Sequence, residues 1–405
     1  MVDPKTFGAL IFKLRRRSGL TQAALAERLN LSDKTVCKWE KGLGFPDITQ
    51  LPALAHLFGV TVDYLFSEQN VGIAVAGNFI ADSVKSISNF PAVGMLADIC
   101  SSVRAIGGCA PNTATDLAVI DPTLPVSVYG RVGDDENGRF MVSKLQKKGI
   151  DVSGVSVSEK TPTSYCDVMS LPTGERTFFS FRGANSEFSP EDLDPSTLGC
   201  KILHIGYVLL LERFDAPDPE YGTVMARFLH DLQKQGIKTS IDAVSSTCLE
   251  DYARKLRPAF AYSDYVIVNE IECCNAWGIE SRRADGSLDV EVIRLAMEKT
   301  MACGVSEKVI VHAKEAGFCL NVDGTFTSIG SLRIPPEEIR GSVGAGDAFC
   351  AGCLYAIYHD YSDLEMLKFA SASAACNLFA ENSVDGMRSK KEIEKLSEQY
   401  ERRSI

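Results

Sequence analysis

The stretch Gly341-Ser342-Val343-Gly344-Ala345-Gly346-Asp347 carries three glycines within six residues and runs directly into the apolar segment 348–356. Because glycine has no Cβ, such a loop can bring its backbone close to a ligand. The small apolar residues that follow predict a helix, whose free N–H groups and dipole favour an anion at its start. Asp347 stands where this helix is expected to begin. Two interpretations of it remain open: a carboxylate base beside a phosphoryl group, or only a helix cap.

Outward from this stretch, strand-like apolar runs alternate with helix-like segments. The predicted strands are 71–76, 201–211, 236–242, 265–269 and 309–312, and the predicted helices include 223–235, 290–303 and 364–379. This alternation predicts an α/β domain in which helices wrap a parallel sheet. Ligands of such sheets bind beyond the carboxyl ends of the strands, so we expect Asp242, Asn269 and the loop at Gly341 at one edge. Two segments, about 79–109 and 156–181, alternate without long helices and are expected to form a separate small sheet.

Composition sets the broad class. The chain has 405 residues, 45% of them apolar and 23% charged, which is typical of soluble globular domains. No apolar run reaches the length of a membrane span and no cleavable signal pattern opens the chain, so we expect a cytoplasmic protein. Thirteen scattered cysteines do not resemble a disulfide framework. Cys350 and Cys353 lack a second pair or a suitably spaced histidine, which favours small packed residues over a metal site.

The N-terminal region differs from the rest in charge and pattern. Residues 1–69 hold nine Lys/Arg against seven Asp/Glu, whereas the whole chain has a net charge of −11, so this part is the best suited to approach a polyanion. An amphipathic helix is predicted over 7–17, a second over 22–29 capped by Thr21, and a third from Ser32 to Gly42. Two short helices joined by a tight turn match helix-turn-helix geometry.

A family resemblance supports this interpretation. The residues Leu20-Thr21-Gln22, the segment 32–36, Lys38-Trp39-Glu40-Lys41-Gly42, Pro46-Asp47 and the segment 60–66 resemble the lambda-repressor/Cro-type helix-turn-helix. The resemblance implies that double-stranded DNA is bound by Gln22, Ser32, Lys34, Thr35 and Lys38, and that Trp39 packs inside. A small helical bundle that contacts proteins is the alternative. Such domains usually bind DNA as dimers, so we expect a homodimer.

Five motifs in the remainder resemble the ribokinase-like sugar kinases of the phosphofructokinase-B type. They are Gly107-Gly108-Cys109-Ala110-Pro111-Asn112, the segment 130–138, Gly183-Ala184-Asn185, Asn269 with Glu272, and Gly344-Ala345-Gly346-Asp347. They stand in the order of that family. The resemblance covers about 72–395 and implies an α/β sandwich with a small β lid, which closes over substrate and often forms the dimer contact.

The resemblance also implies roles for single residues. Asp347 would be the base on the acceptor hydroxyl, and the N–H groups of Gly344, Ala345 and Gly346 would stabilise the transferring phosphoryl group. Asn269 and Glu272 would organise ATP and Mg²⁺, Glu272 through water; Glu272 alone could be a solvated surface charge. The nucleotide side would also include Lys314, Gly317 and Asn377, although Lys314 could merely point outward. His204 and His312 are expected to be packed histidines.

The resemblance to these sugar kinases also implies which residues bind the acceptor. Asp82 and Asn112 would hold hydroxyls of a sugar or polyol, because each can make two hydrogen bonds, and Gly107 and Gly108 would let the acceptor approach the backbone. Asp82 could instead be a turn residue. The predicted organisation is a helix-turn-helix domain at 1–67, a linker at 68–71, a kinase domain at 72–396 and a tail at 397–405.

One departure from the family leaves two functions open. Gly341 stands where the family usually has Asp, and the missing carboxylate would weaken a monovalent-cation site or loosen the loop. The first function is a sugar kinase that carries its own DNA-binding domain. The second is a transcription regulator whose kinase-like domain mainly senses a sugar or its phosphate. The sequence names neither the acceptor nor the operator.

Overall fold

The computed structural model describes residues 3–66, 71–171, 175–195 and 198–405. The chain divides into two compact units, Met1–Val71 with Asp194–Cys200, and Gly72–Leu193 with Lys201–Ile405. Residues 68–70 of the predicted linker lie outside the described residues.

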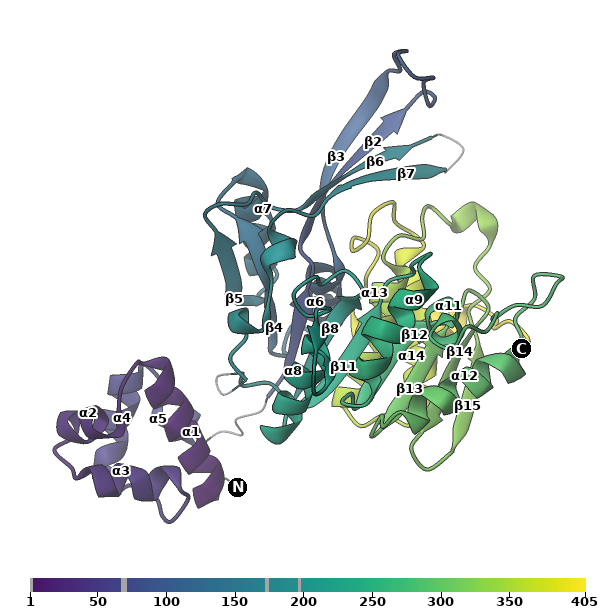
Figure 1. Cartoon of the computed structure of the whole chain (residues 1–405). Coiled ribbons are helices and arrows are strands. Elements are labelled where there is room, and N and C mark those ends of the chain that lie inside the picture. The colour runs from purple at the N-terminus through teal and green to yellow at the C-terminus, as the bar shows by residue number, and fades with distance from the viewer. Residues whose placement is uncertain (1–2, 67–70, 172–174, 196–197) are drawn as a thin grey trace. The chain divides into compact units, whose positions relative to one another are not determined.

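The first unit is a bundle of short helices (Figure 1). These are α1 (Pro4–Arg17), α2 (Gln22–Arg28), α3 (Asp33–Glu40), α4 (Leu51–Phe58) and α5 (Val62–Leu65), with a 3₁₀ turn at Ile48–Gln50. The predicted caps are present: the Thr21 and Ser32 hydroxyls accept hydrogen bonds from the N–H groups of Ala24 and Thr35. Trp39 is buried in the core, as predicted.

The second unit is built on a nine-stranded sheet (Figure 1). Its strand order is β15-β14-β13-β12-β11-β8-β1-β4-β5. The strands are β1 (Ile73–Gly77), β4 (Val126–Gly133), β5 (Asp151–Ser158), β8 (Ile202–Val208), β11 (Lys238–Ala243), β12 (Tyr265–Asn269), β13 (Lys308–His312), β14 (Ala316–Asn321) and β15 (Phe326–Gly330). Neighbouring strands from β5 to β13 in this order pair in parallel, whereas β14 pairs antiparallel with both β13 and β15. The sheet is therefore mixed, whereas the sequence predicted a parallel one.

Helices pack against this sheet in two groups. In one group, α13 (Ala345–Tyr358) lies between α6 (Cys109–Ile120) and α14 (Asp363–Asn377), and α15 (Lys390–Gln399) packs on α14. Ile73, Val75, Ile267 and Ile310 of the sheet share a hydrophobic core with these helices. The other group contains α8 (Val224–Lys234), α10 (Arg257–Phe260), α11 (Glu270–Asn275) and α12 (Val290–Ala302). Two further helices are α7 (Glu136–Lys147), which contacts β5, and α9 (Leu249–Asp251), which continues into a π-helical turn at Tyr252–Leu256.

A separate four-stranded sheet has the order β3-β2-β6-β7 (Figure 1). Its strands are β2 (Ile80–Ile87), β3 (Ile99–Gly107), β6 (Tyr165–Ser170) and β7 (Arg176–Phe181); two further short strands, β9 (Pro217–Asp218) and β10 (Gly222–Thr223), pair with each other elsewhere. The small sheet was predicted, but its second segment begins later than 156, because residues up to Ser158 belong to β5 of the large sheet.

The C-terminal residues are part of the second unit. Helix α15 extends to Gln399, and the N–H of Arg403 donates to the carbonyl of Ser331. Leu332 and Arg402 form an antiparallel bridge. The segment predicted as a tail at 397–405 is therefore hydrogen-bonded to the residues that follow β15. Over the described residues, none of the helices combines the length and the apolar character that a membrane crossing requires.

Candidate active site

A cavity of about 240 Å³ lies at the carboxyl ends of four neighbouring strands, β8, β11, β12 and β13, beside the start of α13. This is the edge at which parallel sheets bind ligands. Its lining residues are Tyr207, Asp242, Ala243, Val244, Ser245, Ile267, Asn269, Glu272, His312, Gly344, Gly346, Asp347 and Cys350. The fold thus brings together the Gly344–Gly346 loop, Asp347, Asn269 and Glu272, which lie up to 78 residues apart in sequence.

The glycine loop opens α13 as predicted. Gly344 is the N-cap residue with φ +77°, in the left-handed region, and a Cβ there would lie 2.4 Å from the carbonyl oxygen of Ser383. Only glycine meets both conditions without strain. The first helical bond runs from Ala348 N–H to the Gly344 carbonyl, so the N–H groups of Gly346 and Asp347 precede it. The N–H of Ala345 instead donates to the Ser342 carbonyl at 3.3 Å.

Asp347 is buried at the start of α13 and has two polar partners. Asn112 Nδ2 donates to its Oδ2 at 2.8 Å, and the Tyr207 hydroxyl donates to its Oδ1 at 2.9 Å. Burial raises the pKa of Asp347 to about 7; the hydrogen bond from Asn112 lowers it, the nearby Asp242 raises it, and the bond from Tyr207 lowers it. A carboxyl with a pKa near neutrality, oriented by two donors, can accept a proton from a reacting group.

Asn269 and Glu272 are coupled to each other at the start of α11. They form a capping box, in which the Asn269 side chain accepts from the Glu272 N–H and the Glu272 carboxylate accepts from the Asn269 N–H. Glu272 also accepts from Asn269 Nδ2 at 2.7 Å and from Ser245 at 3.0 Å. It is buried, not a solvated surface charge, and burial raises its pKa to about 8. The box fixes both side chains on the cavity wall.

Asp82 lies on the small sheet, on β2, so it is not a turn residue. A Cβ on Gly107 of β3 would lie 2.1 Å from Asp82 Oδ2, so the carboxylate lies directly against that glycine. Burial raises the pKa of Asp82 to about 7, with a further contribution from Asp347. The next residue of the pair, Gly108, has φ +90° and precedes α6.

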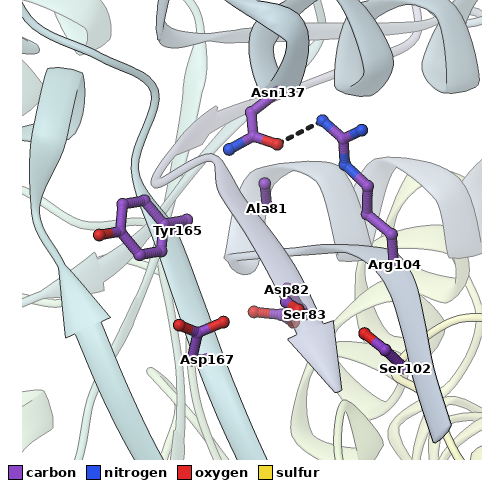
Figure 2. A pocket seen from close by; sticks show the side chains of 8 residues that line it. All are labelled: Ala81, Asp82, Ser83, Ser102, Arg104, Asn137, Tyr165 and Asp167. Carbon is purple, nitrogen blue, oxygen red and sulfur yellow. Dashed lines mark hydrogen bonds between the residues drawn. The ribbon is translucent and has the colours of Figure 1, made fainter. Parts of the chain in front are cut away.

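Asp82 also borders a cavity of about 380 Å³ on the small sheet. Figure 2 shows its polar side chains: Ser83 from β2, Ser102 and Arg104 from β3, and Tyr165 and Asp167 from β6, with Asn137 from α7. Arg104 donates to Asn137 (Figure 2) and also to Glu136 at 2.7 Å.

Asn112 has contacts other than those the resemblance implied. Its Nδ2 donates to Asp347, and its Oδ1 accepts from the Ser383 hydroxyl at 3.0 Å. Both ends of the amide are thus occupied by protein groups in this structure. The amide positions Asp347 instead of reaching toward an acceptor.

Three residues predicted on the nucleotide side do not line the cavity at Asp347. Asn377 is fully buried, and its Nδ2 donates to the carbonyls of Gly344 and Ser383; it ties the glycine loop to a neighbouring segment. Gly317 is in the core, where a Cβ would lie 3.4 Å from both Leu367 and Phe349. Lys314 is exposed and is not among the residues that line the cavity at Asp347.

Tyr207 and His312 were not predicted as site residues. Tyr207 is the second-last residue of β8 and His312 is the last residue of β13. Their positions at the carboxyl ends of strands could have identified them as site residues from the sequence. Burial lowers the pKa of His312 to about 4, which keeps it neutral. His204 is packed as predicted: it is fully buried, with Nδ1 2.9 Å from the Ser240 hydroxyl.

The residues predicted to face DNA differ in their surroundings. Lys34 and Lys38 are exposed on α3. The Ser32 and Thr35 hydroxyls bond to each other at 2.8 Å across the start of α3. Gln22 is half-buried, and its Nε2 donates to Glu40 at 2.6 Å, while Glu40 also pairs with the buried Arg15. Gln22 thus links the start of α2 to the end of α3.

Comparisons with known proteins agree with this geometry. Residues 77–390 match the family model of the pfkB family carbohydrate kinases, and residues 11–65 match a helix-turn-helix model. A ribokinase of Arabidopsis thaliana is 24% identical over 80% of this chain and 80% of its own. An adenosine kinase of Schizosaccharomyces pombe is 26% identical over 74% of this chain and 87% of its own. The solved structure of the Arabidopsis thaliana ribokinase complexed with ribose and ATP has a TM-score of 0.67 at 21% identity, covering 81% of this chain and 99% of that one.

Proposed function

Because the chain belongs to the pfkB family of carbohydrate kinases, we propose that it transfers the terminal phosphoryl group of ATP to a hydroxyl of a sugar or a related small molecule. One observation carries the proposal. Asp347, a buried carboxyl whose pKa burial raises to about 7, lies at the start of α13 in the same cavity as Asn269 and Glu272. A base, an anion-binding helix terminus and oxygen ligands are what phosphoryl transfer asks of a protein.

The reaction follows from this arrangement. Asp347 takes the proton of the acceptor hydroxyl as the oxygen forms a bond to the terminal phosphorus. The bond from that phosphorus to the bridging oxygen breaks, and ADP leaves with the bonding electrons. The N–H groups of Gly344 and Gly346 stabilise the charge on the moving group, which is most effective where water is excluded, whereas the N–H of Ala345 is bonded to Ser342. Asn112 and Tyr207 hold the Asp347 carboxylate in position.

The cavity fits a magnesium ion. Glu272 is a buried carboxyl whose pKa rises to about 8 for lack of solvation, and a cation nearby would favour its charged form. Its oxygens already accept from Asn269 and Ser245, so Glu272 would hold Mg²⁺ through water, as hard cations that retain water allow. When bound, Mg²⁺ neutralises charge on the phosphates of ATP.

The acceptor would bind between the small sheet and Asp347. Asp82 supports this position for the acceptor. The charge of Asp347 contributes to its raised pKa, which requires the two carboxylates to lie near one another. Relatives named ribokinase and adenosine kinase indicate a sugar or nucleoside hydroxyl.

A panel of sugars, nucleosides and sugar phosphates with ATP and Mg²⁺ tests the proposal. We expect ADP release with at least one acceptor, and a loss of kcat of roughly 10²–10⁴-fold in Asp347→Ala. Unchanged turnover in that variant would remove Asp347 from the reaction. Binding of an acceptor with no turnover by the unaltered chain would favour the second candidate below.

The second candidate is a regulator whose kinase-like unit senses a sugar, and Gly341 favours it. A Cβ at Gly341 would lie 2.7 Å from the carbonyl oxygen of Ala380, so the backbone here leaves no room for the carboxylate that the family usually places at this position. We propose that the helix-turn-helix domain binds double-stranded DNA in either case and couples it to ligand binding. Electrophoretic mobility shifts with and without the acceptor test the coupling, which equal affinity in both conditions would contradict.

We further propose a homodimer formed through the small sheet. Ile99 and Val103 of β3 and Phe178 and Phe179 of β7, the two edge strands of the small sheet, are each more than half exposed. Exposed apolar side chains and open sheet edges both favour contact with another chain. Sedimentation of the full chain tests this. We expect a dimer that Phe179→Glu weakens, and a monomer in the unaltered chain would contradict it.

A further inference from the structure

Three buried side chains at the cavity, two of which line it, have no role in the reaction described above. His204 of β8, Asp242 of β11 and Cys350 of α13 are all buried, and one donor atom from each lies within 4.8 Å of the other two. His204 Nε2 is 3.4 Å from Cys350 Sγ and 3.5 Å from Asp242 Oδ2. A thiol, an imidazole and a carboxylate thus converge from three different elements.

We propose that His204, Asp242 and Cys350 form a binding site for a thiophilic divalent cation, and that Zn²⁺ is the ion that fits best. Ligand nitrogen and oxygen atoms about 2.0–2.1 Å from zinc, and sulfur about 2.3 Å from it, stand roughly 3.3–3.7 Å apart at tetrahedral angles. The two distances that involve Nε2, 3.4 and 3.5 Å, fall within this range. The third pair, Cys350 Sγ and the Asp242 carboxylate, lies within 4.8 Å, so rotation of side chains would complete a tetrahedral set.

The orientation of His204 supports the proposal. Its Nδ1 is 2.9 Å from the Ser240 hydroxyl. When Nδ1 donates its hydrogen there, Nε2 carries the free lone pair. Cys350 Sγ is 3.4 Å from Nε2 and 3.9 Å from Nδ1, so it lies beside the ring, and its side chain must rotate to reach a cation on that lone pair. A hydrogen bond from the other ring nitrogen is the usual support of a metal-bound histidine. Burial also lowers the pKa of His204 to about 4, so the ring is in the neutral form that binds metals.

Asp242 supplies an independent sign of a missing partner. Its Oδ1 is buried and has no hydrogen-bond partner among the residues that the structure describes. A buried polar atom without a partner costs free energy. A cation bound at the carboxylate would compensate for this cost.

The site has the character of an open zinc centre. Three protein ligands leave a fourth position, and Asp242 and Cys350 both line the cavity, so water from the cavity can fill it. Burial raises the pKa of both Asp242 and Cys350, so binding releases their protons to the buffer. The thiolate distinguishes this site from the magnesium position at Glu272, because Mg²⁺ prefers oxygen ligands.

A cation in this site would affect the reaction, a consequence that rests on the proposed function. Cys350 is one turn beyond Asp347 on α13, and the charges of Asp242 and His204 already influence the pKa of Asp347. A cation that neutralises the Asp242 carboxylate would remove the charge that raises that pKa, and so would make Asp347 a weaker base. We therefore expect zinc to inhibit the kinase and a chelator to restore it.

Titration of the reduced, untagged full chain with Co²⁺ and Zn²⁺ tests the site. The exposed thiols are first removed by Cys100→Ser and Cys248→Ser. We expect one ion per chain, proton release on binding, and a near-ultraviolet thiolate-to-cobalt charge-transfer absorption that excess Mg²⁺ does not remove. Cys350→Ser should lower the affinity by more than about tenfold. The matched control is Cys353→Ser, a buried cysteine on the same helix, which should bind as the background does.

Other outcomes would overturn the site. These are the absence of stoichiometric binding, a cobalt spectrum without the thiolate band, or equal affinity in Cys350→Ser. If the circular dichroism of Cys350→Ser shows that this variant does not fold, the cobalt spectrum of the chain that retains Cys350 decides whether the site exists, since that measurement needs no substitution at the site. Asp347→Ala should still bind cobalt, so the site can stand even if the proposed reaction fails.

Discussion

At the scale of single residues, the cavity at Asp347 and the small sheet carry carboxyl groups whose pKa values lie far above their usual range. Asp347 and Asp82 are raised to about 7 and Glu272 to about 8, in each case mainly by burial. Such shifts cluster at functional sites, because a buried acid near neutrality can exchange protons there. Their proximity also prepares the cavity to receive cations.

The hydroxyl of Tyr207 should set the pH dependence of the reaction. It donates to ionised Asp347 and so lowers the pKa of that carboxyl. We expect kcat/KM to rise with pH through about 7 as Asp347 ionises. In Tyr207→Phe the rise should move upward by roughly one pH unit. The control is Tyr400→Phe, whose hydroxyl bonds Glu338 away from the cavity; an unshifted profile in Tyr207→Phe would contradict the role.

Asp116 should make the fold less stable as pH rises. It is fully buried on α6, neither carboxylate oxygen has a hydrogen-bond partner among the described residues, and burial raises its pKa well above the ordinary value. Between its unfolded pKa near 3.8 and its higher folded pKa, only the unfolded state ionises, so the free energy of unfolding falls with increasing pH.

Asp116→Asn cannot ionise and should flatten this slope. We expect it to raise the free energy of unfolding at pH 8 by roughly 1–3 kcal/mol, and by less at pH 5. Denaturant unfolding at both pH values measures the difference. Asp121→Asn, after the same helix, is the control, because the Thr123 bond lowers the pKa of Asp121. The same slope in Asp116→Asn as in the unaltered chain would exclude this account.

Site residues were predictable where they belong to a contiguous motif and not where they depend on strand adjacency. Asp347 and the glycine loop, and Asn269 with Glu272, could be identified from the sequence and meet in one cavity. Tyr207 enters it only because β8 lies beside β1 and β11, which no local pattern reveals. Asn377 and Gly317 were assigned by resemblance, and their burial against protein groups could not be deduced from neighbours in sequence.

At the scale of elements, the start of α13 depends on close contact between two backbone segments. Gly344 faces the carbonyl of Ser383, and Asn377 donates to the carbonyls of both residues. The helix terminus is therefore held by segment 377–383, and its N–H groups stay aimed at the cavity.

Gly344→Ala should destabilise the protein by more than the strain of a positive φ alone would. The substitution adds a Cβ in the left-handed region and places it 2.4 Å from the Ser383 carbonyl. Gly149→Ala is a matched control with φ +79° and nothing within 4 Å of the added Cβ. We expect about 1 kcal/mol of destabilisation in the control, and a larger loss together with lost turnover in Gly344→Ala. Equal unfolding midpoints in the two variants would contradict the contact.

Helix α3 should carry most of the DNA affinity. Lys34 and Lys38 are exposed on it, and each lysine that contacts a phosphate adds to the salt dependence of binding. We expect Lys34→Ala with Lys38→Ala to weaken operator binding and to reduce the salt slope by roughly one to two. Lys144→Ala, on α7 of the other unit, is the control. Binding unchanged in the double variant would redirect attention to another face.

At the scale of the whole molecule, the sequence predicted the central strands and helices better than the edge strands of the sheet and the C-terminal segment. Strands 265–269 and helix 290–303 were placed within a residue of their bounds, because apolar runs and caps such as Asp289 mark them locally. The antiparallel pair β14–β15 was missed because neither Ala316–Asn321 nor Phe326–Gly330 was assigned as a strand; periodicity alone does not identify such short runs. The segment at 397–405 was assigned as a tail because hydrogen bonds between distant backbone groups leave no trace in composition.

The contact between the C-terminal residues and the end of β15 has a consequence for solubility. β15 is an edge strand, and the backbone of Glu401 and Arg403 pairs with Arg333 and Ser331 just beyond it. Unpaired backbone at a sheet edge invites pairing with another chain. Truncation after Tyr400 should therefore promote aggregation, visible as increased light scattering on warming, while a tag at this end would compete for the same groups and is better placed elsewhere.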